Sequence, residues 1–403
     1  MRIRDPVHGD ILLPDFARDL LDTEAMQRLR GIRQLGFAHL VYPGCVHTRF
    51  DHSLGTAHTA LALFRAASGY GEGNEVEALV CAALLHDIGH IPFGHTLEDE
   101  FHLFARHDSR ERLWQALQQH DIKAVLVREG LFRLVSDILL HDLPANQAYL
   151  GEMISSTIDA DVLDYLRRDA YFAGLVHNYD DRVLANFTID QGQLVYRLMS
   201  KGLMRQDARS ELLHLLRLRY YLTERVCFHH TKIGAGAMLA KLVGRLGLAL
   251  SEMQEMGDDL LLHSLVARAA KVNDEHSLRL ALALRSRRLY KRSYVSSAHD
   301  HHAGFWANRV ETERSLARLA GVHETEVCVF LGPLGSFKEA DIAVSTVSGI
   351  TPFRQLPELE LSALFAEYQR LCRFYVFAPQ EHCEKVKTAA EELFACTSEF
   401  SRR

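Results

Sequence analysis

Three histidines and an aspartate follow an apolar run in the segment Val76–His95, which reads VEALVCAALLHDIGHIPFGH. The Ala- and Leu-rich run predicts a buried helix, on which His86 and His90 stand four residues apart and share one face. His86 and Asp87 diverge by about 100°, yet both can reach an ion beside the helix. With His95 close behind, the pattern is typical of a metal site rather than of core packing.

A metal site needs ligands from other parts of the chain, and His52 and Asp161 can supply them. Together with His86 and Asp87 they give two imidazoles and two carboxylates. This donor set suits one divalent ion and does not choose among Mn, Fe, Co, Ni, Zn and Mg. The alternative is a set of core histidines satisfied by carboxylates, because His-Asp also occurs at 107–108, 120–121 and 141–142.

A second informative segment is 154–172, ISSTIDADVLDYLRRDAYF. In a helix, Asp161, Tyr165 and Asp169 fall at i, i+4 and i+8, so one stripe carries two carboxylates and a phenol. Asp164 and Arg168 fall on the neighbouring stripe, where we expect them to pair.

The elements that must position these residues are mostly helical. We predict a mainly α fold, with a helical body over residues 1–309 and a smaller α+β subdomain over 310–403. Strands are expected at 326–331, 341–344 and 373–377, helices at 22–36, 210–228, 356–370 and 380–395, and hairpins near 5–13 and 188–198.

Composition limits the class of protein. The chain has 403 residues, a net charge of −6 and seven cysteines without a CxxC pair. Reduced thiols, and a start without an apolar signal core, predict a cytoplasmic protein that does not span a membrane. The negative charge does not favour nucleic acid as a partner.

The H…HD…D pattern of His52, His86, Asp87 and Asp161 resembles the HD-domain phosphohydrolase superfamily. Longer blocks, in the same order, resemble its deoxynucleoside triphosphate (dNTP) triphosphohydrolase family. These blocks are DPVHG at 5–9, MQRLRGIRQLG at 26–36, HTRFDHSLGTAH at 47–58, LLHDIGHIPFGH at 84–95 and DVLDYLRRDAYFAG at 161–174. The resemblance is strong over residues 1–240, with core motifs within 47–174, and the C-terminal part is compatible with it.

The resemblance implies that water attacks the α-phosphorus of a dNTP and releases deoxynucleoside and inorganic triphosphate. A metal at the four ligands would hold an α-phosphate oxygen and lower the pKa of the attacking water. His95 would protonate the departing 5′ oxygen, with Glu98 one turn later to orient it. An animal member of the family has aspartate at the position of Glu98, so this chain departs from the pattern there.

The resemblance also implies residues that bind the substrate and offset its charge. Those expected at the phosphates are Arg49, His90, His107, Arg219 and Lys232. Tyr165 would lie under the sugar and exclude a 2′ hydroxyl, while Asp169 and Gln34 would bind the 3′ hydroxyl. A further Mg²⁺ with the nucleotide is compatible with this arrangement.

Regulation and assembly follow from the same resemblance. Asp22, Gln27 and Arg30 match positions that bind an activating nucleotide between subunits, so nucleotide activation is a hypothesis, with plain helix surface as its alternative. We expect a homo-oligomer, a dimer or a tetramer.

Two other functions stay open, the first because the same metal centre serves it and the second because the HD core could bind a nucleotide without hydrolysing it. One is an HD phosphatase or phosphodiesterase acting on nucleoside monophosphates, modified nucleotides or single-stranded nucleic acid. The other is a non-catalytic nucleotide sensor.

Overall fold

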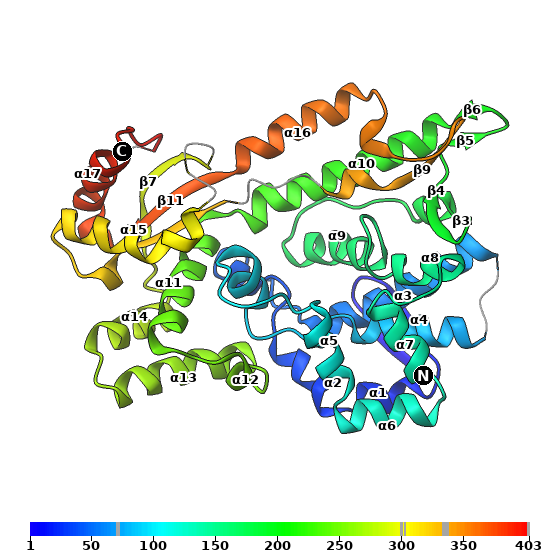
Figure 1. Ribbon diagram of the computed structural model, residues 1–403, viewed down its shortest axis with the longest axis horizontal. Coiled ribbons are helices and arrows are strands. Elements are labelled where there is room, and N and C mark those ends of the chain that lie inside the picture. Colours follow the sequence, from blue (N-terminus) through cyan, green and yellow to red (C-terminus); the bar gives the residue numbers. More distant parts are fainter. Residues whose placement is uncertain (70–72, 299–300, 302–303, 333–337, 401–403) are drawn as a thin grey trace.

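The computed structural model describes residues 1–69, 73–298, 301, 304–332 and 338–400. The fold is mainly α, as the sequence predicts. Figure 1 shows the N-terminal helices gathered in one body, and at the opposite end a sheet on which α15 (Phe305–Ala320) and α17 (Cys383–Phe394) pack. The long helix α10 (Gln206–Leu222) packs against α16 (Leu359–Leu371) and runs over α9 (Ala160–Phe172).

Helices α3 (Arg49–Ser68), α4 (Asn74–Leu85) and α9 form the centre of the body, where α3 packs against the other two. The N-terminus of α3 carries a capping box, in which the Thr48 hydroxyl accepts from the Asp51 amide and the Asp51 carboxylate accepts from the Thr48 amide. Most of α3 is buried, so a side chain on almost any face of it points into protein.

Helix α4 ends earlier than the sequence predicts. Its last residue is Leu85, and the chain after His86 continues in turns. Gly89 and Pro92 follow within seven residues of Leu85, and neither residue favours the continuation of a helix. His86 and His90 therefore do not share a helix face, and His95 lies beyond a turn in which Phe93 has a positive φ of 52°.

The segment expected as one helix at 22–36 is also interrupted. Thr23 caps the short α2 (Glu24–Arg28), one 3₁₀ turn follows over Leu29–Gly31, and Ile32 is extended. The extended backbone lets Arg33 pair with Thr48 as an isolated antiparallel bridge. Tertiary pairing thus overrides the helical pattern here.

The expected hairpins and strands are present. The hairpins are β1 (Arg2–Asp5) with β2 (Gly9–Leu12) and β3 (Phe187–Asp190) with β4 (Gln193–Tyr196). The strands are β8 (Cys328–Leu331), β9 (Ala343–Thr346) and β11 (Arg373–Ala378).

Two sheets each contain strands from both sides of the predicted boundary at residue 310. The hairpin β3–β4 continues into β9 and β10 (Gly349–Pro352), in the order β10-β9-β4-β3. A second sheet has the order β7-β11-β8, and β7 (Lys291–Ser297) lies before residue 310. The boundary at 310 stays a prediction, although strands on both sides of it share this sheet.

The remaining helices complete the body and the part of the chain that follows it. They are α1 (Ala17–Leu21), α5 (Arg110–Leu117), α6 (His120–Arg128), α7 (Phe132–Leu139), α8 (Ala148–Glu152), α11 (His230–Leu246), α12 (Leu250–Met253), α13 (Asp258–Lys271), α14 (Glu275–Arg285), α15 (Phe305–Ala320) and α17 (Cys383–Phe394). Within the described residues, no helix has the length and apolar character needed to cross a membrane.

Candidate metal centre and active site

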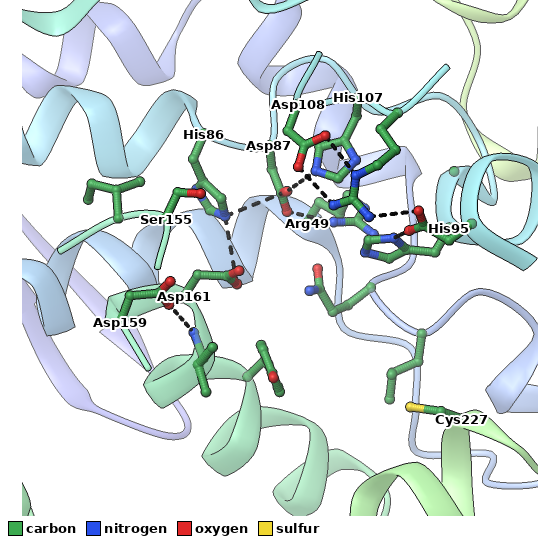
Figure 2. Close-up of a pocket in the computed structure, with 18 of the residues that line it drawn as sticks. Arg49, His86, Asp87, His95, His107, Asp108, Ser155, Asp159, Asp161 and Cys227 are labelled. Carbon is green, nitrogen blue, oxygen red and sulfur yellow. Dashed lines mark hydrogen bonds and ion pairs between the residues drawn. The ribbon is translucent and has the colours of Figure 1, made fainter. Parts of the chain in front are cut away.

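The four predicted metal ligands meet at one corner. His52 comes from α3, His86 and Asp87 from the end of α4, and Asp161 from the first turn of α9. His52 Nε2 lies 2.8 Å from Asp161 Oδ1, and His86 Nε2 lies 3.5 Å from Asp87 Oδ1 and 3.9 Å from Asp161 Oδ1. Ligand atoms of His52, His86 and Asp87 all lie within 4.8 Å of one another. Figure 2 shows His86 directed at the two carboxylates.

The donors at this corner fit a divalent ion. The other ring nitrogen of His86, Nδ1, lies 2.7 Å from the Ala83 carbonyl, which fixes this nitrogen as the donor. His86 Nε2 is buried and has no hydrogen-bond partner among the described residues. A ring nitrogen held by a backbone carbonyl, with the other left free toward carboxylates, is the usual arrangement of a metal-binding histidine.

Behind His52 lies a buried network in which each charged group has partners. His52 Nδ1 lies 2.7 Å from Asp164 Oδ2, and His8 Nε2 lies 2.5 Å from Asp164 Oδ1. Arg168 donates to Asp164 at 2.8 Å and to Asp5 at 2.8 Å. The expected pair of Asp164 and Arg168 is therefore present, and it orients His52 from the rear.

The electrostatics of the corner favour positive charge. Burial opposes protonation of His52, but its hydrogen bonds to Asp161 and Asp164 raise its pKa to about 10. Burial likewise opposes ionisation of Asp87, yet Arg49, whose Nη1 lies 2.6 Å from Asp87 Oδ2, holds the pKa of that carboxyl well below its usual range. A divalent ion would displace the proton of His52 and bind ionised carboxylates.

A second cluster adjoins the corner and contains His90, His95 and His107, whose ligand atoms also lie within 4.8 Å of one another. The rings of His90 and His107 stack at 3.5 Å. His90 Nε2 lies 3.2 Å from Asp87 Oδ1, so the two clusters share the Asp87 carboxylate.

The partner of His95 differs from the prediction. His95 Nδ1 lies 2.7 Å from Asp99 Oδ2, whereas Glu98 turns inward. Glu98 accepts from Arg112 at 2.6 Å, and its Oε2 lies 3.1 Å from His107 Nδ1. The physical reason is a π-helical turn over Thr96–Glu100, which is wider than an α-helical turn and brings the fourth residue, not the third, beside His95.

Both clusters border one pocket of about 440 Å³. The predicted site residues that line it are Gln34, Arg49, His86, Asp87, His95, His107, Asp161, Tyr165, Arg219 and Lys232. Four of the other residues predicted for the metal, for catalysis or for the substrate lie outside the lining, namely His52, His90, Glu98 and Asp169. Figure 2 shows Cys227 on the opposite side of this pocket from His86.

Asp169 is held away from the expected 3′-hydroxyl role. Its Oδ1 lies 2.7 Å from His47 Nε2, and the His47 ring stacks on Phe172 at 4.5 Å. Gln34 does line the pocket, and its Oε1 has no partner within the part of the chain that the structure describes.

The three residues of the regulatory hypothesis lie together but outside the pocket lining. Gln27 donates to the Leu21 carbonyl at 2.8 Å, and Arg30 Nε donates to Gln27 Oε1 at 2.9 Å. The Arg30 guanidinium also lies 3.6 Å from the centre of the Phe50 ring. Asp22 is exposed beside them.

Several pocket residues were not predicted from the sequence. Asp99, Arg106, Asp159, Lys338 and Glu339 line the pocket as well. Only Asp99 had a local signal, as an acid four residues after His95. Lys338 and Glu339 arrive from the far C-terminal part, where no spacing pointed to them.

Two family models match the chain: an HD domain over residues 49–169 and an HD associated region over residues 180–402. An uncharacterised protein of Methanocaldococcus jannaschii is 27% identical over 401 residues, which cover 96% of this chain and 80% of that protein. An uncharacterised protein of Bacillus subtilis is 32% identical over 250 residues, 60% of this chain and 55% of the relative.

The human deoxynucleoside triphosphate triphosphohydrolase SAMHD1 is 30% identical over 223 residues, 46% of this chain and 35% of the enzyme. The chain therefore spans about a third of that enzyme's length. Among solved structures, a phosphohydrolase from Bacteroides thetaiotaomicron has a TM-score of 0.74 at 22% identity, covering 94% of this chain and 100% of that one. A hypothetical protein from Aquifex aeolicus has a TM-score of 0.73 at 23% identity, covering 97% and 99%.

Proposed function

Because the chain belongs to the HD-domain phosphohydrolase superfamily and carries its HD-associated region, we propose that it is a metal-dependent dNTP triphosphohydrolase. The reaction would be water attack on the α-phosphorus, which releases deoxynucleoside and inorganic triphosphate. One observation carries this proposal. The corner with the four candidate metal ligands and the second cluster, which contains His95 and His107, border the same pocket, beside Tyr165.

His52, His86, Asp87 and Asp161 would hold the divalent ion. When bound, such an ion polarises a phosphate oxygen and lowers the pKa of water. The network of Asp164 and Arg168 keeps His52 in place, and the Ala83 carbonyl does the same for His86.

Proton transfer would fall to His95. Asp99 binds its Nδ1 and holds the ring in place, so Nε2 is the atom that can donate a proton to the departing 5′ oxygen. Arg49 and His107 border the same space and would offset the charge that develops on the phosphate.

The sugar would lie against Tyr165, which lines the pocket. The guanidinium of Arg219 lies over the Tyr165 ring, 5.3 Å from its centre. Gln34 Oε1 is a buried acceptor without a partner in the described residues, which suits it to a 3′ hydroxyl. Asp169 would act indirectly, because His47 already binds it.

Four cations of the pocket are already paired with carboxylates, and this supports a second candidate, hydrolysis of nucleoside monophosphates. Arg49 pairs with Asp87, and Arg106 pairs with Asp99 and Asp108. Lys232 pairs with Glu100, and Arg219 with Glu339. A triphosphate would have to break these pairs or bring its own Mg²⁺, whereas a monophosphate carries less charge.

Product analysis separates the two candidates. Purified protein is incubated with each dNTP, rNTP and dNMP, in Mn²⁺ or Mg²⁺, with and without GTP. Deoxynucleoside and triphosphate are the expected products. Orthophosphate from dNMP, with no product from dNTPs, would replace the first candidate by the second, and pyrophosphate with dNMP would refute the assigned bond.

The same experiment tests regulation and assembly. A rate increase with GTP, together with a shift from monomer to dimer or tetramer in mass photometry, is expected if Asp22, Gln27 and Arg30 bind an activator. Arg30→Ala should then abolish the GTP effect and leave the corner's metal content unchanged.

A further inference from the structure

The N-terminus of α13 packs tightly against two loops that border the pocket. The backbone of Gly257 touches Gly31, since a Cβ on Gly257 would lie 2.8 Å from the Gly31 carbonyl oxygen. Arg28 donates to the Met256 carbonyl at 3.4 Å and to the Ile88 carbonyl at 3.1 Å. A segment of the HD-associated region therefore contacts the chain just before Arg33 and just after Asp87.

Asp258, the first residue of α13, is fully buried at this contact. Its Oδ1 accepts from the Phe93 amide at 3.1 Å, and its Oδ2 accepts from the Arg33 amide at 3.0 Å and from Arg33 Nη1 at 3.3 Å. Both carboxylate oxygens are thus occupied by donors from the two loops.

The Phe93 amide lies at a constrained point of the turn that leads into His95. Phe93 has a positive φ of 52°, which costs energy for a residue with a side chain. A Cβ on the next residue, Gly94, would lie 2.4 Å from His90 Nδ1, and His95 follows directly. A shift of the Phe93 peptide would therefore displace His90 or His95.

The Arg33 amide has a comparable place in the second loop. Arg33 pairs with Thr48, and the Gln34 amide donates to the His47 carbonyl at 3.0 Å. The Arg49 amide donates to the Ile32 carbonyl at 2.9 Å. The backbone that Asp258 holds thus carries Gln34 and supports Arg49.

We infer that Asp258 is a positioning residue of the active site, a carboxylate from the HD-associated region that fixes the loops bearing His95 and Gln34. It acts through Phe93 and Arg33, because Asp258 itself lies outside the pocket lining. The inference rests on the proposed function only in that catalysis depends on His95. A carboxylate suits this place because all three groups facing it are donors, which an asparagine amide could satisfy only in part.

The neighbouring Asp259 provides a matched control. It is also in the first turn of α13, but it is exposed, and among the described residues its carboxylate contacts only the Arg33 guanidinium, at 3.2 Å. Asp259→Asn removes the same charge from the same helix end, and it leaves both backbone contacts intact.

The experiment compares Asp258→Asn, Asp258→Glu and Asp259→Asn in the full-length protein, with whichever nucleotide the unsubstituted protein hydrolyses. Asp258→Asn should lower kcat by about 10- to 100-fold with KM within about threefold, and with metal content unchanged. Asp259→Asn should stay within about twofold. Hydrogen exchange of the peptide covering 91–97, which needs no substrate, should accelerate in Asp258→Asn only.

The outcomes are separable. Unchanged kcat and unchanged exchange in Asp258→Asn would overturn the inference, as would equal losses in Asp258→Asn and Asp259→Asn. If Asp258→Asn does not fold, Asp258→Glu decides, because its longer side chain should still lower kcat and accelerate exchange at 91–97. A protein without dNTP turnover but with the expected exchange pattern would refute the proposed function and keep the inference.

Discussion

The two sides of His52 differ in how their polar groups are satisfied. On the rear, Asp164, Arg168, Asp5 and His8 form a buried network of direct contacts. On the front, toward the pocket, His86 Nε2 and His90 Nδ1 have no hydrogen-bond partner among the described residues, while His90 Nε2 lies 3.2 Å from Asp87 Oδ1.

This difference separates stability from function. A buried polar group without a partner costs free energy, and a hydrogen-bonded partner offsets that cost. The rear network thus supports the folded chain whether or not an ion or a substrate is bound. The unpaired nitrogens on the front lower the stability of the empty site, and a bound ion or substrate would remove that cost. Substitutions on the two sides should therefore affect different measurements.

The largest effect is expected on the front. His86→Ala should remove the ion and lower kcat by about a thousandfold or more, because it deletes a ligand. The free energy of unfolding in a chelator should change by only about 1 kcal/mol, since Nε2 makes no protein hydrogen bond there. Metal analysis, turnover and urea unfolding test this, and an unchanged metal content would contradict the assignment of His86 as a metal ligand.

On the rear, Asp164→Ala should lower the free energy of unfolding by about 3–5 kcal/mol, also in a chelator. The reason is that His52, His8 and Arg168 would remain buried without their shared carboxylate. Urea unfolding measures this, with the exposed Asp190→Ala as control. If Asp164→Ala lowered kcat but left the free energy of unfolding unchanged, the proposed difference between the two sides would be wrong.

A smaller effect should separate Asp99 from its neighbour in the pocket. Asp99→Asn should lower kcat by about 10- to 100-fold, because His95 loses the carboxylate that binds its Nδ1 and orients its ring. Asp108→Asn breaks a pair with Arg106 but leaves His95 and Asp99 in contact. Its kcat should fall by less than about threefold in the same assay, and equal losses would contradict the role of Asp99.

The smallest effect concerns stability and pH at Asp258. Burial raises the pKa of Asp258 to about 6, although the Arg33 and Phe93 amides and the Arg33 side chain lower it. Because the folded-state pKa exceeds the usual 3.8, ionised Asp258 costs stability, by about 3 kcal/mol at most, at pH values above 6. The cost disappears as pH falls from about 6 towards 4.

Asp258→Asn should therefore raise the free energy of unfolding by about 1–2 kcal/mol at pH 7.5, once about 1 kcal/mol for a lost hydrogen bond is subtracted. The gain should shrink between pH 6 and pH 4. The charged group that contacts Asp258 is Arg33, whose guanidinium also binds the exposed Asp259 on the same helix. Urea unfolding across this pH range measures the gain, and a constant difference would exclude burial as its cause.

The sequence predicted the parts of the site whose chemistry is local. Residue types and spacing alone placed His86, Asp87, Asp161 and Tyr165 in a common site, and these four residues line one pocket. The predicted pair of Asp164 with Arg168 is confirmed. The mainly α class and the late strands are confirmed for the same reason, since helical and strand periodicity are local signals.

The rest depended on geometry that spacing does not encode. The end of α4 at Leu85 and the π-helical turn over Thr96–Glu100 changed which residues face each other, so Asp99 replaced Glu98 beside His95. Lys338 and Asp258 reach the site through long-range packing, for which a single sequence contains no periodic signal.

The pairing of Tyr196 in β4 with Val344 in β9 has a consequence for biosynthesis. The Leu198 amide also donates to Ser345 Oγ at 3.1 Å, so this sheet closes only when nearly the whole chain has been translated. All four candidate metal ligands precede residue 162, whereas Arg219, Lys232, Asp258 and Lys338 follow later. The candidate metal ligands are thus synthesised before the residues that complete the wall of the pocket.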